Sequence, residues 1–328
     1  MNVLLQEEPT PVPKVTIITP LHNKGPFIAE TIRSVLKQTF SDWEMIVVEN
    51  GSDDDGPASV GNFPDSRIRL IHSPRIGPGA ARNEGLATAR GEWILFLDAD
   101  DTMEPECLAS RLALLERAAD AAFLVSRWSE ATDGGRPEIK TPEGEGRTGR
   151  WVEDCSIAFP PWAVHAALVR RSCLGSNPWP EELDAYASED TAFWFPLVQG
   201  KRIAYSGRCD VLYRIQPGNS RNEILDSLRW IDSVIAVTSR NIGYLKDCGR
   251  SPNPHQALFL AKGFENAATI AFEKGDRKGA KKALIHAKAW LPFCDKRSRA
   301  VRIRRLFGIP LLLRISLLIR CFRRILPL

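Results

Sequence analysis

The sequence predicts an α/β protein with a mostly parallel sheet flanked by helices, followed by a helical C-terminal region. Three observations support this prediction. The N-terminal part alternates short apolar segments with segments of helical spacing, the apolar segments are rich in β-branched residues, and most end in turns of glycines, prolines or acids. Such alternation is typical of βαβ units, whose strands are parallel. Beyond about residue 222 the apolar residues follow helical spacing alone.

The individual elements follow from these patterns. Residues 14–19 form a β-branched strand that we expect to end at Pro20, and residues 93–97 are an unbroken apolar run that indicates a strand buried on both faces. The other expected elements are strands at 43–48, 67–72 and 163–170, and helices at 27–38, 77–90, 225–245, 255–272 and 278–290.

The composition narrows the structural class to which the chain can belong. At 328 residues, with 44% hydrophobic and 26% charged residues, the chain has the composition of a soluble globular protein. Its seven cysteines are scattered without a Cys-x-x-Cys pair, which argues against a disulfide framework or zinc site and favours a reducing compartment. Residues 1–13 contain two acids and no long apolar core, so we do not expect a signal peptide.

The charge is distributed unevenly. Residues 296–328 carry ten Lys or Arg and no acid, so the rest of the chain has 34 basic and 40 acidic residues, a balance of −6. An acidic body does not suit nucleic acid. The tail reads as a basic amphipathic helix that binds an anionic membrane surface, because its longest charge-free run, 306–313, is too short to span a bilayer. Docking on a partner or on the preceding part of the chain itself is the alternative.

Three acids follow the strand at 93–97. On an extended chain Asp98 and Asp100 point to the same side, roughly 6 to 7 Å apart. Ligands of α/β folds bind at the carboxyl edge of the sheet, and hard cations prefer oxygen ligands, so the pair predicts a divalent metal site. The alternative is surface charge. Asp101 is expected to be structural, because Asp101 and Glu104 fit the cap of a following helix.

Two further polar positions stand at helix starts. Arg82 follows a turn of small residues and suits a phosphate or ribose contact, with coverage of the helix surface as an equal alternative. Glu189 and Asp190 lead into an apolar helix. Taken alone, they are acids that interact with the helix dipole.

Five ordered segments resemble the family 2 glycosyltransferases with the GT-A fold, a Rossmann-like sheet flanked by helices. These segments are VTIITP at 15–20, SVLKQT at 34–39, VVENGS at 47–52, ARNEG at 81–85 and LDADD at 97–101. The resemblance covers about residues 12–220. It implies inverting transfer of a sugar from a nucleotide-diphosphate donor, with Mn²⁺ or Mg²⁺ as cofactor.

The resemblance assigns the donor side residue by residue. Thr19, Pro20 and His22 would line the base and ribose, with His22 standing where the family usually has Tyr. Glu49 replaces an Asp that contacts the base, and Asn50 replaces a second common Asp.

Asp98 and Asp100, which follow the strand at 93–97, resemble the family's DXD motif. Asp98 would meet the nucleoside and Asp100 the metal. Gln216 stands where the family often has a His that helps to hold the metal or diphosphate, and Arg214 would offset diphosphate charge.

The resemblance also assigns the acceptor side. Asp190 would be the base that takes the proton from the acceptor hydroxyl, with Glu189 in a supporting role. The aromatic residues between 151 and 162 would form a sugar-stacking wall, although core packing is the better interpretation for at least half of them. The preceding connection, residues 133–149, is expected to be mobile.

Together these observations predict a glycosyltransferase of cell-surface polysaccharide biosynthesis, acting on a glycan or lipid-linked glycan. We expect it to be cytoplasmic and peripheral on the inner membrane face. The expected divisions are an extension at 1–13, a catalytic domain at 14–221, a helical region at 222–295 and the basic tail at 296–328. The alternative is a non-catalytic GT-A scaffold that recruits partners at the membrane, motivated by the altered positions His22, Asn50 and Gln216.

Overall fold

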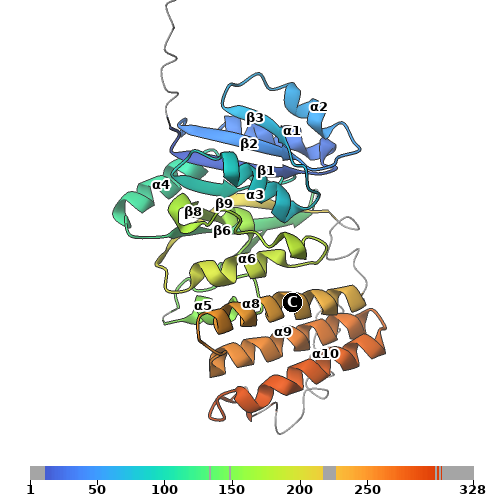
Figure 1. The fold of residues 1–328 in the computed structure, drawn as a ribbon. Coiled ribbons are helices and arrows are strands. Elements are labelled where there is room, and N and C mark those ends of the chain that lie inside the picture. The colour runs from blue at the N-terminus through green and yellow to red at the C-terminus, as the bar shows by residue number, and fades with distance from the viewer. Residues whose placement is uncertain are drawn as a thin grey trace, which may run out of the picture.

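The computed structural model describes residues 12–132, 134–147, 149–216, 227–299, 301, 302 and 304. A sheet with flanking helices forms the N-terminal part, and a stack of helices extends from one side of it (Figure 1). The expected domain boundary at residue 221, residues 1–11 of the N-terminal extension and most of the basic tail lie outside the described residues.

The elements alternate as expected in the N-terminal half and are helical at the C-terminus. The strands are β1 (Val15–Leu21), β2 (Trp43–Glu49), β3 (Ile68–His72), β4 (Trp93–Phe96), β5 (Thr102–Met103), β6 (Phe123–Thr132), β7 (Glu138–Lys140), β8 (Ala167–Arg170) and β9 (Ile203–Ile215). The helices are α1 (Gly25–Leu36), α2 (Gly56–Gly61), α3 (Pro78–Thr88), α4 (Cys107–Arg117), α5 (Trp151–Cys155), α6 (Glu189–Val198), α8 (Ser227–Asp247), α9 (Pro254–Glu273) and α10 (Arg277–Trp290). Short 3₁₀ turns lie at Val164–Ala166, Arg171–Cys173, Glu181–Leu183 and Leu291–Phe293.

The strand order is β3-β2-β1-β4-β8-β6-β9-β5, with β7 paired to β6. β1 lies between β2 and β4 in parallel register, and Val15 faces both Trp43 and Trp93. β3 is also parallel to β2, so the carboxyl ends of four neighbouring strands meet at one edge. β8 is antiparallel to β4, and the far half of the sheet is mixed.

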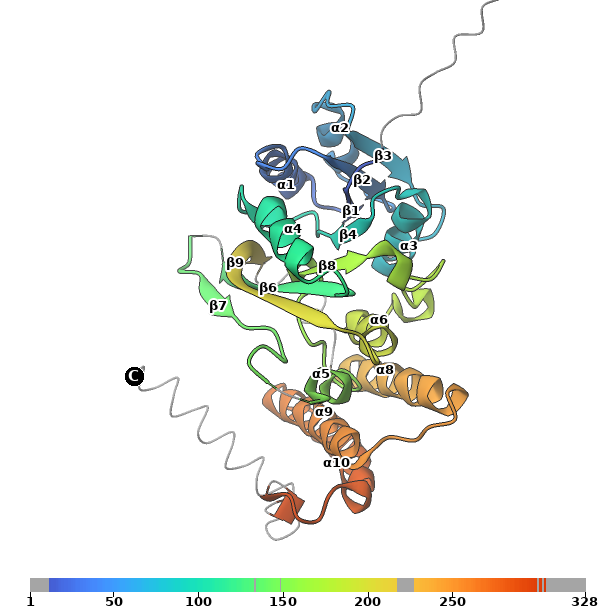
Figure 2. The same cartoon turned by 90° about the vertical axis from the view of Figure 1, so that its left-hand side faces the viewer.

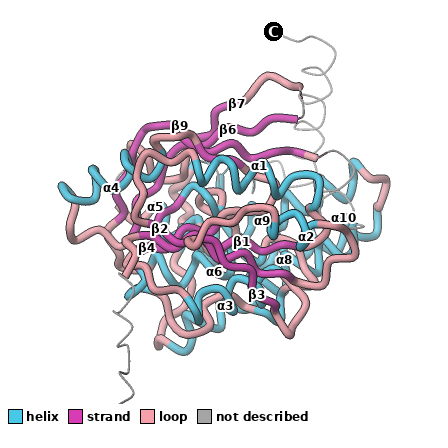
Figure 3. Tube along the Cα trace, turned by 90° about the horizontal axis from the view of Figure 1, so that it is seen from above, coloured by secondary structure: helices cyan, strands magenta, loops and turns pink. Residues whose placement is uncertain are grey.

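Helices cover both faces of this sheet, and α1 and α3 lie on opposite sides of it (Figure 3). The strands between them are therefore buried on both faces, as the unbroken apolar run Trp93–Leu97 predicts. Gly85 lets α3 approach β1 closely, because a Cβ there would lie 2.5 Å from Ile18 Cγ2.

Several local predictions are wrong. Pro20 does not end β1, which continues to Leu21, and α2 was not expected between β2 and β3. The expected strand at 163–170 begins with a 3₁₀ turn and is extended only from Ala167. Within the described residues of the connection 133–149, a short strand that was not expected, β7, pairs with β6.

The C-terminal helices pack against the α/β part through a hydrophobic cluster. Figure 2 shows α6 above α8, with α9 and α10 below it. The cluster joins α5, the segment after it and α6 to α8 and α9, through Cys155, Ile157, Phe195, Leu245, Phe259 and Leu260. The predicted helices 225–245, 255–272 and 278–290 match α8, α9 and α10 to within two residues at each end.

The aromatic residues between 151 and 162, proposed as a sugar-stacking wall, are engaged in packing. Trp151 and Phe159 contact Phe259 of α9 edge to face, with ring centroids 5.2 Å and 6.4 Å apart. Trp162 is 2% exposed and packs against Phe123 and Trp194 in the main core. All three rings take part in core packing, the interpretation favoured for at least half of these aromatic residues. Trp151 and Phe159 join the α/β part to α9, and Trp162 lies in the main core.

Candidate active site

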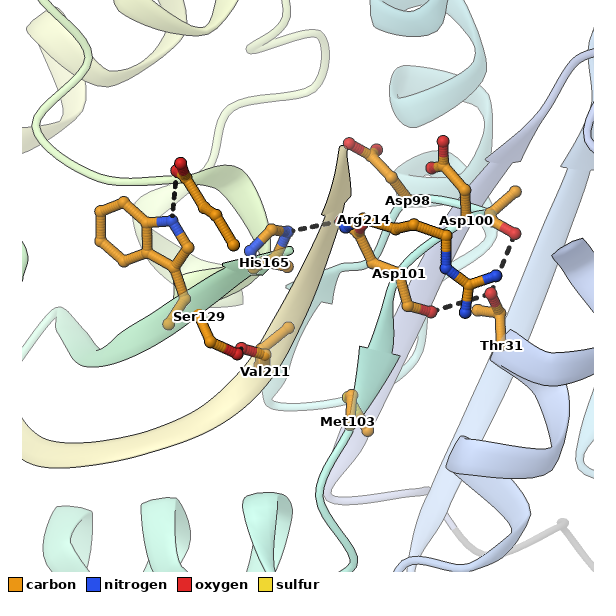
Figure 4. A network of polar contacts seen from close by, with 12 residues as sticks. Thr31, Asp98, Asp100, Asp101, Met103, Ser129, His165, Val211 and Arg214 are labelled. Atoms are coloured by element: carbon orange, nitrogen blue, oxygen red, sulfur yellow. Dashed lines mark hydrogen bonds and ion pairs between the residues drawn. The ribbon is translucent and has the colours of Figure 1, made fainter. Parts of the chain in front are cut away.

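Three aspartates follow β4 in a tight turn at the carboxyl edge of the sheet. β4 ends at Phe96, and the N–H of Asp101 donates to the carbonyl of Asp98 at 3.1 Å. The carboxylates of Asp98 and Asp100 point to one side of this turn, and that of Asp101 points away from them (Figure 4). The same-side arrangement that we inferred for an extended chain is thus produced by a turn.

Asp101 is structural, but the predicted helix cap is wrong. Residues 102–103 form β5, and α4 begins only at Cys107. The Asp101 carboxylate is fully buried, accepts the backbone N–H of Arg214 at 3.0 Å and lies 2.7 Å from His165 Nδ1. Burial raises the pKa of Asp101 to about 6, although His165 opposes the shift. This buried contact joins the aspartate turn to β9 and the turn before β8.

A second buried ion pair, Arg111 with Asp210, holds the backbone of His165 in place. Arg111 of α4 donates to both oxygens of Asp210, at 3.2 Å and 2.7 Å, and to the His165 carbonyl at 3.2 Å. Burial alone would lower the pKa of Arg111, but Asp210 raises it above its ordinary value. The segments that carry His165 and Asp210 are therefore held together by hydrogen bonds as well as by apolar packing.

Asp100 lies in a small polar cluster that includes two loop residues. Lys24, which follows β1, places its ammonium 2.7 Å from Asp100 Oδ2 and 3.1 Å from Gln216 Oε1. Gln216 Nε2 donates to the same Asp100 oxygen at 2.7 Å. The resemblance indicated Gln216 beside the metal position, whereas Lys24 was not predicted. The Asp100 side chain is 16% exposed, so the cluster remains accessible to solvent.

The residues of this cluster fit a hard divalent cation only in combination with a substrate. No group of three or more His, Cys, Asp or Glu side chains suited to a metal occurs within the described residues. Asp100 already attracts a cation, the Lys24 ammonium, and Gln216 adds an amide oxygen beside it. Mg²⁺ is commonly held by one or two carboxylates and by substrate phosphates, so this donor set is compatible with such a metal.

Arg82 connects the aspartate turn to α6. It is 4% exposed, donates to Asp98 Oδ1 at 2.7 Å and lies 3.5 Å from Glu189 Oε1. Its guanidinium stacks over Trp179, 4.3 Å from the ring centroid. Burial alone would lower the pKa of Arg82, but the charges of Asp98 and Glu189 raise it. The alternative in which Arg82 covers the helix surface is therefore wrong.

Glu189 and Asp190 open α6, as expected. Ser188 before them has a left-handed backbone with φ of 63°, which starts the helix abruptly. Glu189 is 4% exposed and turned toward Arg82, and Asp190 also contributes to the pKa shift of Arg82. Asp190 Oδ1 accepts the N–H of Thr191 at 2.8 Å. The structure thus brings Asp98, Arg82 and the acidic pair together.

The N-terminus of α3 is capped by a residue that sequence reasoning missed. The carboxylate of Asp184 accepts the N–H groups of Gly79 and Ala80 at 2.8 Å and 3.0 Å. Its approach requires glycine, because a Cβ on Gly77 or Gly79 would lie 2.1 Å or 2.5 Å from an Asp184 oxygen. The signal available in the sequence was a helix opening at Gly77 with no local capping side chain, whose N–H groups must find a distant acceptor.

Asn83, next to Arg82, fixes the segment that carries Asp184. Its side chain accepts the N–H of Trp179 at 3.0 Å, and donates to the Trp179 carbonyl and to Glu181 at 2.9 Å. Trp179 stacks on Phe193 of α6 with the ring centroids 3.8 Å apart. Arg82 therefore contacts the start of α6, and Asn83 holds the segment 179–181.

The residues proposed for the nucleoside lie at the carboxyl ends of β1 and β2. Thr19 is fully buried, Pro20 is half-buried and His22 is exposed, with Nδ1 3.0 Å from the Asn50 carbonyl. Glu49 Oε1 accepts the N–H of Ser52 at 2.6 Å, which lowers the pKa of Glu49, and His72 adds to the shift. Glu49 is therefore held in place by its own turn.

Two further residues singled out from the sequence, Asn50 and Arg214, have structural contacts of their own. The Asn50 side chain bonds the Arg75 carbonyl at 2.6 Å and the Gly77 N–H at 2.8 Å, and so fixes the approach to α3. Arg214 pairs with Glu30 of α1 at 2.7 Å and lies over the ring of Phe27.

The described residues contain no helix long and apolar enough to cross a bilayer.

We predict opposite effects of Gly→Ala changes at two helical positions. Gly79→Ala should destabilise the fold by about 1–2 kcal/mol, because the new methyl group displaces the Asp184 cap. Gly243→Ala in α8 should stabilise it by about 0.5–1 kcal/mol, since a Cβ there has no neighbour within 4 Å. Urea unfolding measures both. Equal stabilisation by the two changes would contradict the capping role of Asp184.

The chain is similar in sequence to several known proteins. The family model of glycosyl transferase family 2 matches residues 16–164. The succinoglycan biosynthesis protein ExoO of Rhizobium meliloti is 44% identical over 112 residues, which are 34% of this chain and 31% of that protein. The putative teichuronic acid biosynthesis glycosyltransferase TuaG of Bacillus subtilis is 33% identical over 226 residues, 66% of this chain and 83% of that protein. The chain spans about a third of the length of several other curated relatives it matches.

Solved structures show the same fold. The S. aureus TarS 1–349 complex with UDP-GlcNAc has a TM-score of 0.65 at 19% identity, covering 92% of this chain and 89% of that chain. The mannosyltransferase PcManGT of Pyrobaculum calidifontis, in complex with GDP-Man and Mn²⁺, has a TM-score of 0.55 at 20% identity, with 93% and 81% covered. The fold, the matched family model and the extent of the match to TuaG show that this chain belongs to glycosyl transferase family 2.

Proposed function

We propose that this protein transfers a sugar, with inversion, from a nucleotide-diphosphate donor to a hydroxyl group of a glycan or glycolipid. One observation carries the proposal. Arg82 contacts Asp98, which follows β4, and Glu189, which opens α6 beside Asp190. Arg82 therefore links Asp98, which is proposed for the donor, to the start of α6, where Asp190 is proposed as the base.

The donor diphosphate is proposed to lie over the aspartate turn. Asp98 would hold the nucleoside, and Asp100 and Gln216 would hold a divalent cation. When bound, Mn²⁺ or Mg²⁺ would offset the negative charge that grows on the departing diphosphate. Thr19, Pro20, His22 and Glu49, at the ends of β1 and β2, would line the base and ribose. Two relatives of the fold were solved with UDP-GlcNAc and GDP-Man, and the latter also with Mn²⁺, which supports this class of donor and cofactor.

Asp190 is proposed to act as the base. In an inverting reaction the acceptor oxygen bonds to the anomeric carbon as the bond from that carbon to the diphosphate oxygen breaks. The hydroxyl proton passes to the Asp190 carboxylate, and the nucleoside diphosphate leaves with the bonding electron pair. Glu189, held by Arg82, would keep the start of α6 in place, and Arg214 would lie near the diphosphate charge.

The acceptor is proposed to be a growing polysaccharide, including a lipid-linked one. The names of ExoO and TuaG connect those proteins with succinoglycan and teichuronic acid biosynthesis, which supports this class of pathway. We further propose that the catalytic domain extends over residues 14–221. The basic tail, residues 296–328, would hold the protein peripherally on the inner membrane face.

Nucleotide binding tests the donor site. We expect one of UDP, dTDP and GDP to bind in calorimetric titrations, and Mn²⁺ to tighten it. Asp100→Asn should abolish the effect of Mn²⁺, because it removes the carboxylate that attracts the cation. Asp247→Asn, an exposed acid near the end of α8, is the matched control and should bind like the wild type. Absence of nucleotide binding by the folded protein would favour the non-catalytic scaffold.

Removal of the proposed base tests the transfer step. With the nucleotide sugar identified by titration, Asp190→Asn should lower kcat by roughly 10²–10⁴-fold and leave nucleotide affinity unchanged. Asparagine still offers an oxygen to the Thr191 N–H, so α6 should remain intact. Release of nucleoside diphosphate in the presence of acceptor is the readout, and Glu182→Gln, an exposed change nearby, is the control. A wild-type kcat for Asp190→Asn would assign the base to another residue.

A further inference from the structure

α10 is the outermost helix at the end of the molecule opposite β3 and α2 (Figure 1). Its small residues face inward and are buried, namely Gly279, Ala280, Ala283 and Ala287. Its outward residues are exposed, namely Arg277, Lys278, Lys281, Lys282, Ile285, Lys288 and Ala289. With 3.6 residues per turn, Ile285 falls near the middle of this outer face, with basic residues on both sides.

The charge of this outer face is almost unopposed. α10 contains five Lys or Arg and no acid. Lys282 pairs with Asp232 of α8 at 2.7 Å. The other four basic residues, Arg277, Lys278, Lys281 and Lys288, have no acidic partner among the described residues. Four like charges on one helix face repel one another, so they favour an external polyanion.

Three large apolar side chains, one in α10 and one on each side of it in the sequence, are exposed. Ile285 is 61% exposed in the middle of the face. Phe272, near the end of α9, is 50% exposed, and Phe293, in the turn after α10, is 63% exposed. Exposed aromatic and aliphatic side chains beside Lys and Arg are typical of surfaces that lie in a membrane interface, where the apolar groups enter the headgroup region. A soluble polyanion would not bury them.

The chain after α10 packs beside α9 and is rich in basic residues. Val301 is buried against Ala257 and Cys294, and Arg304 pairs with Glu265 of α9 at 2.7 Å. The described chain therefore ends beside α9, at the same end of the molecule as α10. In the sequence, residues 296–328 add ten further Lys or Arg and no acid.

We propose that the outer face of α10, whose flanking segments in the sequence carry the exposed Phe272 and Phe293, docks on an anionic lipid bilayer. The charges would attract acidic headgroups, and the apolar side chains would enter the interface. This places a folded docking surface within the helical region, in addition to the proposed role of the tail. The inference does not depend on the donor or the reaction, because it concerns a surface far from the aspartate turn.

Vesicle sedimentation of the full chain tests this proposal. The wild type should bind vesicles of phosphatidylcholine with phosphatidylglycerol and bind phosphatidylcholine alone weakly. Lys278→Ala with Lys281→Ala should weaken binding to the anionic vesicles by about thirtyfold, since each charge contributes about fivefold. Ile285→Ser should weaken binding in its own right. The matched control is Lys37→Ala with Lys201→Ala, which removes two exposed charges elsewhere and should bind like the wild type.

Three results would overturn the proposal. They are equal binding to both vesicle types, wild-type binding by the α10 double variant, and loss of heparin binding by that variant without loss of vesicle binding. The last result would assign the face to a soluble acidic polymer. Because alanine has a higher helix propensity than lysine, the double variant should have a thermal midpoint at least as high as that of the wild type. Nucleotide titration of the same variants reports on the donor site separately.

Discussion

The buried guanidinium of Arg82 is the interaction on which the arrangement of the site depends. A charge 4% exposed must be compensated, and Asp98 and Glu189 provide the compensation from segments more than ninety residues apart in sequence. Trp179 covers its flat face and is itself held by Asn83 and Phe193. The position of α6 relative to the sheet edge is therefore set by electrostatics at one point and by aromatic packing around it.

The aspartate turn divides its three carboxylates between structure and proposed chemistry. Asp101 points inward to His165 and the backbone of β9, where it fixes the turn. Asp98 and Asp100 are left on the other side, facing Arg82 and Lys24. Because the inward residue is anchored through the buried Arg111–Asp210 pair, the outward pair is presented by a rigid support. Such preorganisation is what a transfer reaction requires of its donor site.

Much of this arrangement could be predicted from the sequence, because local signals coincided with the global fold. The apolar run before Asp98 specified a buried strand, and the order of the motifs specified the family. What could not be predicted were contacts made across long sequence separations. Lys24, Trp179 and Asp184 stand in segments with no distinctive local pattern, and only the fold brings them to the site. The error at Asp101 had the same origin, since a plausible cap was overridden by a distant histidine.

A double-mutant cycle on Arg82 and Glu189 tests the central claim most directly. The free energies of unfolding of the wild type, Arg82→Met, Glu189→Gln and the double variant would be measured in urea. Our account predicts that Arg82→Met alone costs about 3–5 kcal/mol, because it leaves a buried carboxylate uncompensated. It also predicts that the two changes are coupled by at least about 1 kcal/mol. Costs that add within about 0.5 kcal/mol would contradict the view that this guanidinium ties α6 to the edge of the sheet.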